Sequence, residues 1–351
     1  VAFITAERGD GDRVRFHGPY RNPSQFKGLQ SGEEDTAIDI SEKEFRSWSP
    51  SLIVPFFQSN EVAELFMVTH RQPSFFNAPA TRNFRFVTEL HTNAQKSMYE
   101  SGTGIPGDIE VWTGRTFHYW NPNFGTVYTT ADRAIVENFL VERRLRQVRR
   151  KDGAFYGLPV SWAEDPTTLP LQSARVAFRD VARATDTRTV IAGLIPPGVV
   201  LVEKAPYLFN RDGDARDEAL VLGVMSSRPF DWNARRIVEN KISLGVLESL
   251  PFPFTDSNGF LEKRLIENSG RLAAVDDRYA EWAEAVGVPV GSANDPETKA
   301  GLIAENDAIV AKLYGLTRGQ IEVLFQTFHV GWDYTEDLTK TLKYFDALED
   351  V

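Results

Sequence analysis

The chain contains no cysteine among its 351 residues. This absence excludes a disulfide framework, zinc sites built from thiolates and a cysteine nucleophile. No apolar run approaches the roughly 20 residues that a membrane-spanning helix needs. The first residues also lack a basic segment followed by a long apolar one, so no secretory signal peptide is predicted.

The composition that remains is that of a folded globular protein, with 42% hydrophobic and 25% charged residues. The length allows about two domains and a core that needs no support from a metal or a disulfide. The sequence starts without Met and runs directly into a strand pattern. We therefore interpret it as a piece of a longer protein.

The charge is distributed unevenly along the chain. Acidic residues outnumber basic ones by 49 to 39, which argues against a generic basic nucleic-acid binder. Residues 256–351 hold 18 acidic and 9 basic residues, whereas residues 133–188 hold 7 acidic and 11 basic residues. A local nucleic-acid contact is therefore compatible with the acidic total.

Hydrophobic spacing predicts an α+β fold in which a strand-rich region precedes a helical C-terminal part. A hairpin is expected at the start, with Gly9–Asp12 as its turn. Residues 174–255 alternate strand patterns with a helix over Ala219–Asn233, which Pro229 interrupts. We also interpret Leu244–Leu250 as a strand.

Residues 256–351 have helical spacing throughout. Apolar residues from Leu272 to Val286 are three and four positions apart, a heptad-like pattern that predicts a helix. Thr317 and Gln320 fit a capping box, so another helix is predicted to begin at about Arg318.

Motifs that would indicate a catalytic or metal site are weak or missing. Gly102–Gly107 matches a dinucleotide-binding pattern, but it contains Pro106 and precedes a strand-like segment, 108–112, where a helix is required. Asn210–Asp214 has the composition of a calcium loop without its spaced ligands. The five histidines show no paired metal spacing. The residues themselves therefore offer no catalytic constellation.

A basic helix, predicted over residues 132–151, is the strongest physical indication of function. Six cations lie within 143–151, and we assign them to the face opposite an apolar one that includes Ile135, Val136 and Leu140. They could neutralise several phosphates, although a solvated face that pairs with the acidic tail is equally compatible.

The candidate DNA-contacting residues are these cations and three later arginines. Two of the later three have an alternative, because Arg179 and Arg183 could equally be structural and pair with Asp180 or Asp186. The full set is Arg143, Arg144, Arg146, Arg149, Arg150, Lys151, Arg179, Arg183 and Arg188.

Several short motifs occur in order along the chain. They are Phe178–Arg183, Thr187–Thr189, Ile195–Gly198, Leu222–Ser227, Phe230–Trp232, Leu250–Pro253, Leu313–Thr317, Phe325–His329 and Gly331–Tyr334. Together they resemble the target-recognition region and the closing motif of type IIG restriction–modification enzymes. The related adenine methyltransferases of phage-defence systems such as BREX share this resemblance, which covers nearly the whole chain.

Full-length members of that family also have a catalytic methyltransferase domain. It binds S-adenosylmethionine, flips an adenine out of the duplex and holds the amine with an Asn-Pro-Pro-Tyr type motif. This sequence has no such tetrapeptide, and neither Asn121–Phe124 nor Ile195–Gly198 substitutes for it. S-adenosylmethionine is thus expected for the parent protein and no cofactor for this chain.

The resemblance implies the specificity portion of a cytoplasmic, site-specific DNA adenine methyltransferase or restriction–modification enzyme. Its implied partners are double-stranded DNA and an upstream methyltransferase domain of the same protein. The alternative is a module that uses its acidic helical tail for protein interaction or DNA mimicry.

We accordingly predict four segments. They are 1–30, the end of an upstream catalytic domain or a hairpin; 31–151, a mixed α/β segment that ends in the basic helix; 152–255, the target-recognition domain; and 256–351, a helical C-terminal domain.

Overall fold

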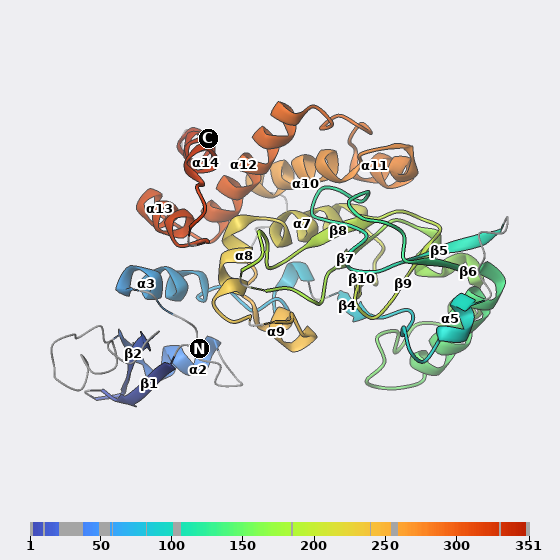
Figure 1. Cartoon of the computed structure of the whole chain (residues 1–351), viewed down its shortest axis with the longest axis horizontal. Coiled ribbons are helices and arrows are strands. Elements are labelled where there is room, and N and C mark those ends of the chain that lie inside the picture. Colours follow the sequence, from blue (N-terminus) through green and yellow to red (C-terminus); the bar gives the residue numbers. More distant parts are fainter. Residues whose placement is uncertain are drawn as a thin grey trace.

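The computed structural model describes residues 3–9, 11–20, 38–48, 57, 59–81, 83–100, 107–183, 185–238, 240–253, 259–329 and 331–348. These residues form helices and three small sheets, which confirms the predicted α+β class. Figure 1 shows the C-terminal helices stacked over the sheets, with the N-terminal hairpin to one side.

The N-terminal sheet has three antiparallel strands in the order β1-β2-β3. The predicted hairpin is confirmed, because β1 and β2 pair across the turn that contains Gly11, whose φ is 66°. Phe16 and Ile40 belong to the main hydrophobic cluster, so this sheet packs against the main core. The elements are β1 (Phe3–Arg8), β2 (Arg13–Tyr20), β3 (Ile38–Ser41), α2 (Glu42–Trp48) and α3 (Asn60–Thr69).

Two further sheets occupy the middle of the molecule. The larger is antiparallel, in the order β4-β10-β7-β8, and the smaller, β6-β5-β9, pairs β5 in parallel with β9. Their strands are β4 (Phe84–Val87), β5 (Asp108–Trp112), β6 (Thr129–Asp132), β7 (Arg175–Phe178), β8 (Ala192–Ile195), β9 (Val199–Leu201) and β10 (Tyr207–Asn210). The associated helices are α4 (Lys96–Glu100), α5 (Arg133–Val148) and α6 (Val160–Glu164).

Helices then bury the larger sheet. Strands β7 and β8 are buried at every position, and α7 packs against both of them. The predicted interruption at Pro229 is confirmed, because two helices replace one and Pro229 lies in the first turn of the second. These helices are α7 (Ala215–Met225), α8 (Arg228–Arg235) and α9 (Leu244–Ser249).

The strand expected over Leu244–Leu250 is wrong, since this segment forms α9. The Ser243 side chain accepts a hydrogen bond from the backbone N–H of Val246, which caps the helix, and Pro251 follows its end. A short apolar run alone does not distinguish a strand from a helix.

The C-terminal part is helical, as predicted. Thr317 and Gln320 form the capping box, and α13 begins at Arg318. The heptad-like pattern does not lie on one helix, because Asp276 caps a new turn by accepting from the N–H of Arg278. The elements are α10 (Phe260–Ala273), the 3-10 turn η4 (Asp277–Tyr279), α11 (Ala280–Val286), α12 (Pro296–Leu313), α13 (Arg318–Gln326) and α14 (Thr335–Ala347).

The C-terminal helices share a core with the sheets. Helix α10 lies against α7 at Gly223, where a Cβ atom would come within 2.2 Å of the Ser269 hydroxyl oxygen. One hydrophobic cluster contains both Trp232 and Tyr279, so the core continues across the segment boundary predicted at 255. Within the described ranges, no helix is long and apolar enough to cross a lipid bilayer.

Candidate nucleic-acid interface

The basic helix α5 is anchored at its start and along one side. Asp132, the last residue of β6, accepts a hydrogen bond of 3.0 Å from the backbone N–H of Ile135 and caps the helix. Val136 and Leu140 pack into the cluster formed around β5. Figure 1 shows α5 at the opposite end of the molecule from α13 and α14.

The buried side of α5 includes one of the predicted DNA-binding residues. Val136, Leu140, Arg144 and Val148 are the buried positions, spaced four apart, whereas Ile135 is 45% exposed. Arg144 therefore lies on the inner face, which corrects our assignment of all six cations to the outer face.

Arg144 fastens the segment that follows the helix. Its guanidinium donates to the carbonyl oxygens of Ala163, Asp165 and Thr168 at 2.7–3.1 Å. The same group lies 4.3 Å from the centre of the Trp162 ring. Because its N–H groups are bound to acceptors inside the protein, Arg144 has a structural role.

A groove of about 470 Å³ lies on the outer side of α5. Helix α5 contributes the residues of one face, and His91 and Gln95 come from the segment before α4. No carboxylate is among the lining residues, which are His91, Gln95, Phe139, Arg143, Arg146, Gln147 and Arg150. The groove therefore combines three cations with amide and imidazole groups.

Arg143 is the deepest cation of this groove. It is half-buried and donates to the backbone oxygen of Glu89 and, at 3.0 Å, to the Thr88 hydroxyl. Burial lowers the pKa of Arg143, because a desolvated cation is less stable than a hydrated one. An anion in the groove would compensate that desolvation.

The other cations of the run lie at the surface. Arg146 is 4.0 Å from Glu142, and Arg150 pairs with Asp152 at 2.6 Å. Arg149 and Lys151 are exposed. Among the described residues, no ion pair joins residues 143–151 to the acidic tail, so these pairs do not support the interpretation that the tail neutralises this helix.

Two of the three later arginines contact residues 117–119, the segment that follows β5. Arg179 is half-buried and donates to the Phe117 carbonyl oxygen at 2.7 Å, while the Arg188 guanidinium lies 4.8 Å from the Tyr119 ring centre. Burial lowers the pKa of His118, between them, to about 4, and the charges of both arginines add to the shift.

Arg183 and Arg188 differ in accessibility. Arg183 is exposed, and its backbone N–H donates to Asp186 at 3.0 Å. Arg188 is only 3% exposed and also lies 5.6 Å from the Phe328 ring centre. We therefore keep Arg183 as a candidate DNA contact and assign Arg188 and Arg179 to the internal structure.

Sequence reasoning missed the polar partners of the groove. Gln147 carried a detectable signal, because it lies one turn beyond Arg143 on the same helix face. His91 and Gln95 carried none, since they come from a segment about fifty residues earlier that only the fold brings beside α5.

The glycine-rich stretch Gly102–Gly107, which matches a dinucleotide-binding pattern in sequence, lies mostly outside the described residues. Only Gly107 of Gly102–Gly107 lies within the described residues, and strand β5 follows it directly. A phosphate- or nucleotide-binding loop needs a helix N-terminus at that point. In the described part of the chain, no three His, Asp or Glu side chains are grouped to hold a metal ion.

Comparisons with solved structures gave likenesses of low identity, among them two restriction enzymes. No family model and no curated protein matches the chain. The type IIL restriction–modification enzyme MmeI, solved in complex with DNA, is 13% identical over 72% of this chain, with a TM-score of 0.35. The type IIG restriction endonuclease BpuSI is 12% identical over 83% of this chain, with a TM-score of 0.31. The matches cover 36% and 38% of those chains, respectively.

Proposed function

We propose that this chain is the DNA target-recognition portion of a site-specific DNA adenine methyltransferase or restriction–modification enzyme. In this proposal it holds duplex DNA for a catalytic domain of the same protein, which flips and methylates the base. The sequence motifs from Phe178–Arg183 to Gly331–Tyr334 support the choice of family.

The groove on α5 is the observation that carries the proposed DNA contact. It presents Arg143 and Arg146 on one face of α5, with Arg150 just beyond the end of the helix, and none of its lining residues is a carboxylate. Arg149 and Lys151 extend the positive surface beyond the helix. Such a surface suits the phosphate backbone, which orients the protein on the duplex but carries no direct sequence information.

Base reading would need groups that both donate and accept hydrogen bonds. Gln95 and Gln147 line the groove and have amides of the kind that pair with adenine edges. A base-flipping enzyme needs contacts on the duplex to offset the energy of unstacking. We propose that the arginines supply those contacts and that the two glutamines contribute to base reading.

The acidic tail gives no specific support to the alternative function. Glu305 pairs with Arg264 of α10, and Asp307, only 1% exposed, pairs with Arg228 of α8. A DNA mimic needs carboxylates on its surface, and these two are used inside the fold. The exposed carboxylates of the tail include Glu281 on α11 and Glu336 on α14.

The test is a triple substitution of exposed cations, Arg146→Ala, Arg149→Ala and Arg150→Ala. Binding of a duplex oligonucleotide, measured by fluorescence anisotropy at several salt concentrations, should weaken for every sequence. The salt slope should fall by about 0.9 for each lost phosphate contact. Thermal unfolding should change little, because the three side chains are exposed.

A matched control removes three exposed cations from other surfaces: Lys43→Ala, Lys263→Ala and Lys343→Ala. This set lowers the net charge equally but lies on helices α2, α10 and α14. Equal loss of binding in both triple variants would show a general charge effect and contradict the groove assignment.

The finer proposal concerns the cofactor. If methyl transfer belongs to the upstream domain, the 351-residue chain should bind no S-adenosylmethionine by calorimetry and should not methylate duplex DNA. Joining the chain to the upstream segment of its parent protein should make both assays positive. Binding of the cofactor by this chain alone would contradict this division of labour.

A further inference from the structure

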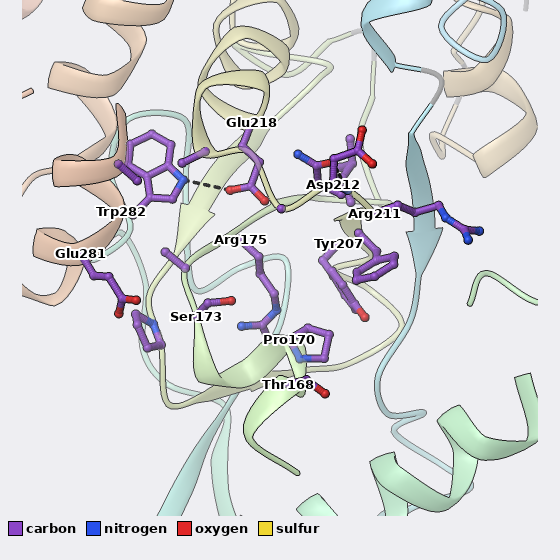
Figure 2. Close-up of a pocket in the computed structure, with 18 of the residues that line it drawn as sticks. Thr168, Pro170, Ser173, Arg175, Tyr207, Arg211, Asp212, Glu218, Glu281 and Trp282 are labelled. Carbon is purple, nitrogen blue, oxygen red and sulfur yellow. Dashed lines mark hydrogen bonds between the residues drawn. The ribbon is translucent and has the colours of Figure 1, made fainter. Parts of the chain in front are cut away.

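A second, larger cavity shares no lining residue with the basic groove on α5. Its volume is about 670 Å³, which is within the range of small-molecule sites. Strands β7 and β10, helix α7 and helix α11 contribute to its wall. Figure 2 shows the labelled lining residues arranged around this space.

The carboxyl group of Glu218 on α7 is the buried acidic group of this cavity. Glu218 is 9% exposed, and its Oε2 accepts a hydrogen bond of 2.9 Å from the indole N–H of Trp282 on α11. Among the described residues, Oε1 has no hydrogen-bond partner, yet it retains accessible surface, because it is not one of the fully buried atoms that lack a partner. Figure 2 shows the carboxyl group projecting from α7 into the space between the labelled residues. This oxygen is therefore an acceptor that a ligand can reach.

No cation in the described part of the chain pairs with the Glu218 carboxyl group. Arg175 pairs with Glu89 at 2.8 Å, and Figure 2 shows its guanidinium directed away from Glu218. The other two lining arginines also have partners elsewhere, so a positive charge at this oxygen must come from a ligand. Their partners are the carbonyl oxygen of Tyr156 for Arg211, at 2.9 Å, and Asp276 for Arg278, at 2.8 Å.

Three further carboxylates line the cavity, and all three are exposed: Asp212 after β10, Asp277 on η4 and Glu281 on α11. Asp212 accepts a hydrogen bond from the Asn83 amide, and within the described ranges none of the three forms an ion pair. Figure 2 shows Asp212 and Glu281 on either side of Glu218. In the same ranges, no three acidic or histidine side chains are close enough to hold a metal ion. The negative charges thus lie at separate points, which suits a ligand with separate positive charges.

The surroundings of Glu218 are themselves acidic. Burial raises the pKa of Glu218 to about 7, the charges of Asp214 and Asp217 add to the shift, and the charge of Arg175 opposes it. The ionised carboxyl group is therefore costly in the empty cavity. A bound cation would offset that cost more completely than the single indole donor does.

Aromatic rings form much of the remaining wall. Trp162, Tyr207, Phe209 and Trp282 all line the cavity, and the Trp162 and Phe209 rings lie 5.7 Å apart. The face of such a ring attracts an ammonium group, and it also offers apolar surface to an alkyl chain. Carboxylates and aromatic rings in one cavity therefore favour an organic cation over an anion or a neutral ligand.

We propose that this cavity binds a linear organic polyamine, with one ammonium group donating to Oε1 of Glu218 and a second pairing with the exposed carboxylates of the lining. The alkyl chain between the two ammonium groups lies along the aromatic wall. The site shares no residue with the proposed DNA groove, so either proposal can fail without the other.

Calorimetric titration with spermidine at pH 8 tests the proposal, since Glu218 is then largely ionised. Butylamine, with one ammonium group, and butanol, with none, are the comparison probes. Spermidine should bind about 10-fold more tightly than butylamine, because its further ammonium groups gain ion pairs at the exposed carboxylates. Butanol should not bind at millimolar concentration. Spermidine binding that is absent at that concentration, or no tighter than butylamine binding, would overturn the proposal.

Glu218→Gln is the decisive variant for the inner ammonium group. The amide oxygen can still accept from Trp282, so the fold is kept, but the charge is lost, and spermidine and butylamine should each bind at least about 10-fold more weakly. Glu284→Gln is the matched control, because Glu284 is exposed on the same helix as Trp282 and does not line the cavity. An unchanged affinity in Glu218→Gln, with thermal unfolding intact, would also overturn the proposal.

A second variant tests the outer ammonium group by neutralising the three exposed carboxylates. It should remove most of the preference for spermidine over butylamine and leave butylamine binding, because Glu218 is unchanged. A control triple variant neutralises three exposed carboxylates on α3, α11 and α12 and should keep the preference. A preference that survives in the first variant, or is lost equally in both, contradicts the two-point placement. The first set is Asp212→Asn, Asp277→Asn and Glu281→Gln, and the control set is Glu64→Gln, Glu284→Gln and Glu297→Gln.

Discussion

The basic helix and the acidic tail both place part of their charge inside the fold, but the buried charges have different partners. On α5, Arg146 is exposed, whereas Arg144 is buried and donates to backbone carbonyl oxygens. In the tail, Glu336 is exposed, whereas Asp307 and Glu305 are buried and bind arginines of other helices. The buried cation of the helix thus serves the backbone, and the buried carboxylates of the tail form ion pairs between helices.

This difference shows why a charge count along a sequence is a poor guide to partners. A net charge describes solubility and long-range attraction, but a contact depends on which groups remain exposed after folding. The predictions below substitute members of the two regions and of the cavity, and then measure whether each acts on stability or on binding.

The largest effect is expected for Arg228→Met, which breaks the link between α8 and the tail. Arg228 donates to Asp307 at 2.7 Å and also pairs with Asp337. Asp337 is half-exposed and can be hydrated, but Asp307 would keep a buried, unpaired charge. The free energy of unfolding, measured by denaturant titration, should fall by about 3–5 kcal/mol.

Lys340→Met is the matched control for that loss. Lys340 pairs with Glu336 on the exposed side of α14, and such surface pairs contribute about 0–1 kcal/mol. Similar losses in the two variants would mean that the burial of Asp307 does not decide the effect.

The next prediction concerns pH and Glu218. Its pKa is about 7 in the folded chain, against an ordinary value of 4.5, because burial favours the neutral acid. The folded state therefore holds the proton more tightly, and its stability should fall as pH rises from about 4.5 to 7. The loss is roughly 3 kcal/mol by linkage.

Denaturant titrations at pH 5, 6, 7 and 8 measure this decline. Glu218→Gln should remove it, since the amide does not titrate, and Glu281→Gln should leave it in place. An identical pH profile in Glu218→Gln would show that other groups cause the decline.

Much of the fold followed from residue spacing. The capping residues Thr317 and Gln320 fixed the start of α13, and Pro229 marked a helix boundary, because both act within one turn of their own position. The prediction of a strand over Leu244–Leu250 was wrong because the apolar pattern there does not distinguish a strand from a helix. Its few apolar residues suit a strand or a helix equally, and the Ser243 cap decided the outcome.

The candidate site was only partly predictable. The inward orientation of Arg144 could be predicted, because Arg144 continues the four-residue spacing of Val136 and Leu140. Its charge alone favours a position at the surface. The cavity of about 670 Å³ that Arg175, Glu218 and Trp282 line was not predictable, because these residues lie about 40 to 110 positions apart. The packing of α7 on β7 and of α11 on α7 brings them together.

Arg144→Met should follow in size of effect. The carbonyl oxygens of Ala163, Asp165 and Thr168 would lose their donor, and part of that loss can be recovered by water near the surface. We expect the free energy of unfolding to fall by about 2–3 kcal/mol, with little change in the salt slope of DNA binding. A reduced salt slope at unchanged stability would reverse our assignment of Arg144 to the fold.

The smallest effect on stability is expected for Arg149→Ala, five positions along the same chain. Arg149 is exposed at the end of α5, so the free energy of unfolding should change by no more than about 0.5 kcal/mol. Its proposed role is a single phosphate contact, and the salt slope of duplex binding should therefore fall by about 0.9 for every sequence tested.

Anisotropy titrations between low and moderate salt measure the slope. Arg183→Ala, which removes a second exposed arginine outside the groove, is measured beside Arg149→Ala. If Arg149→Ala lowers stability as much as Arg144→Met does, α5 has no division between an inner and an outer face. If it changes neither quantity, the phosphate backbone does not contact Arg149, and Arg149 is not part of the interface.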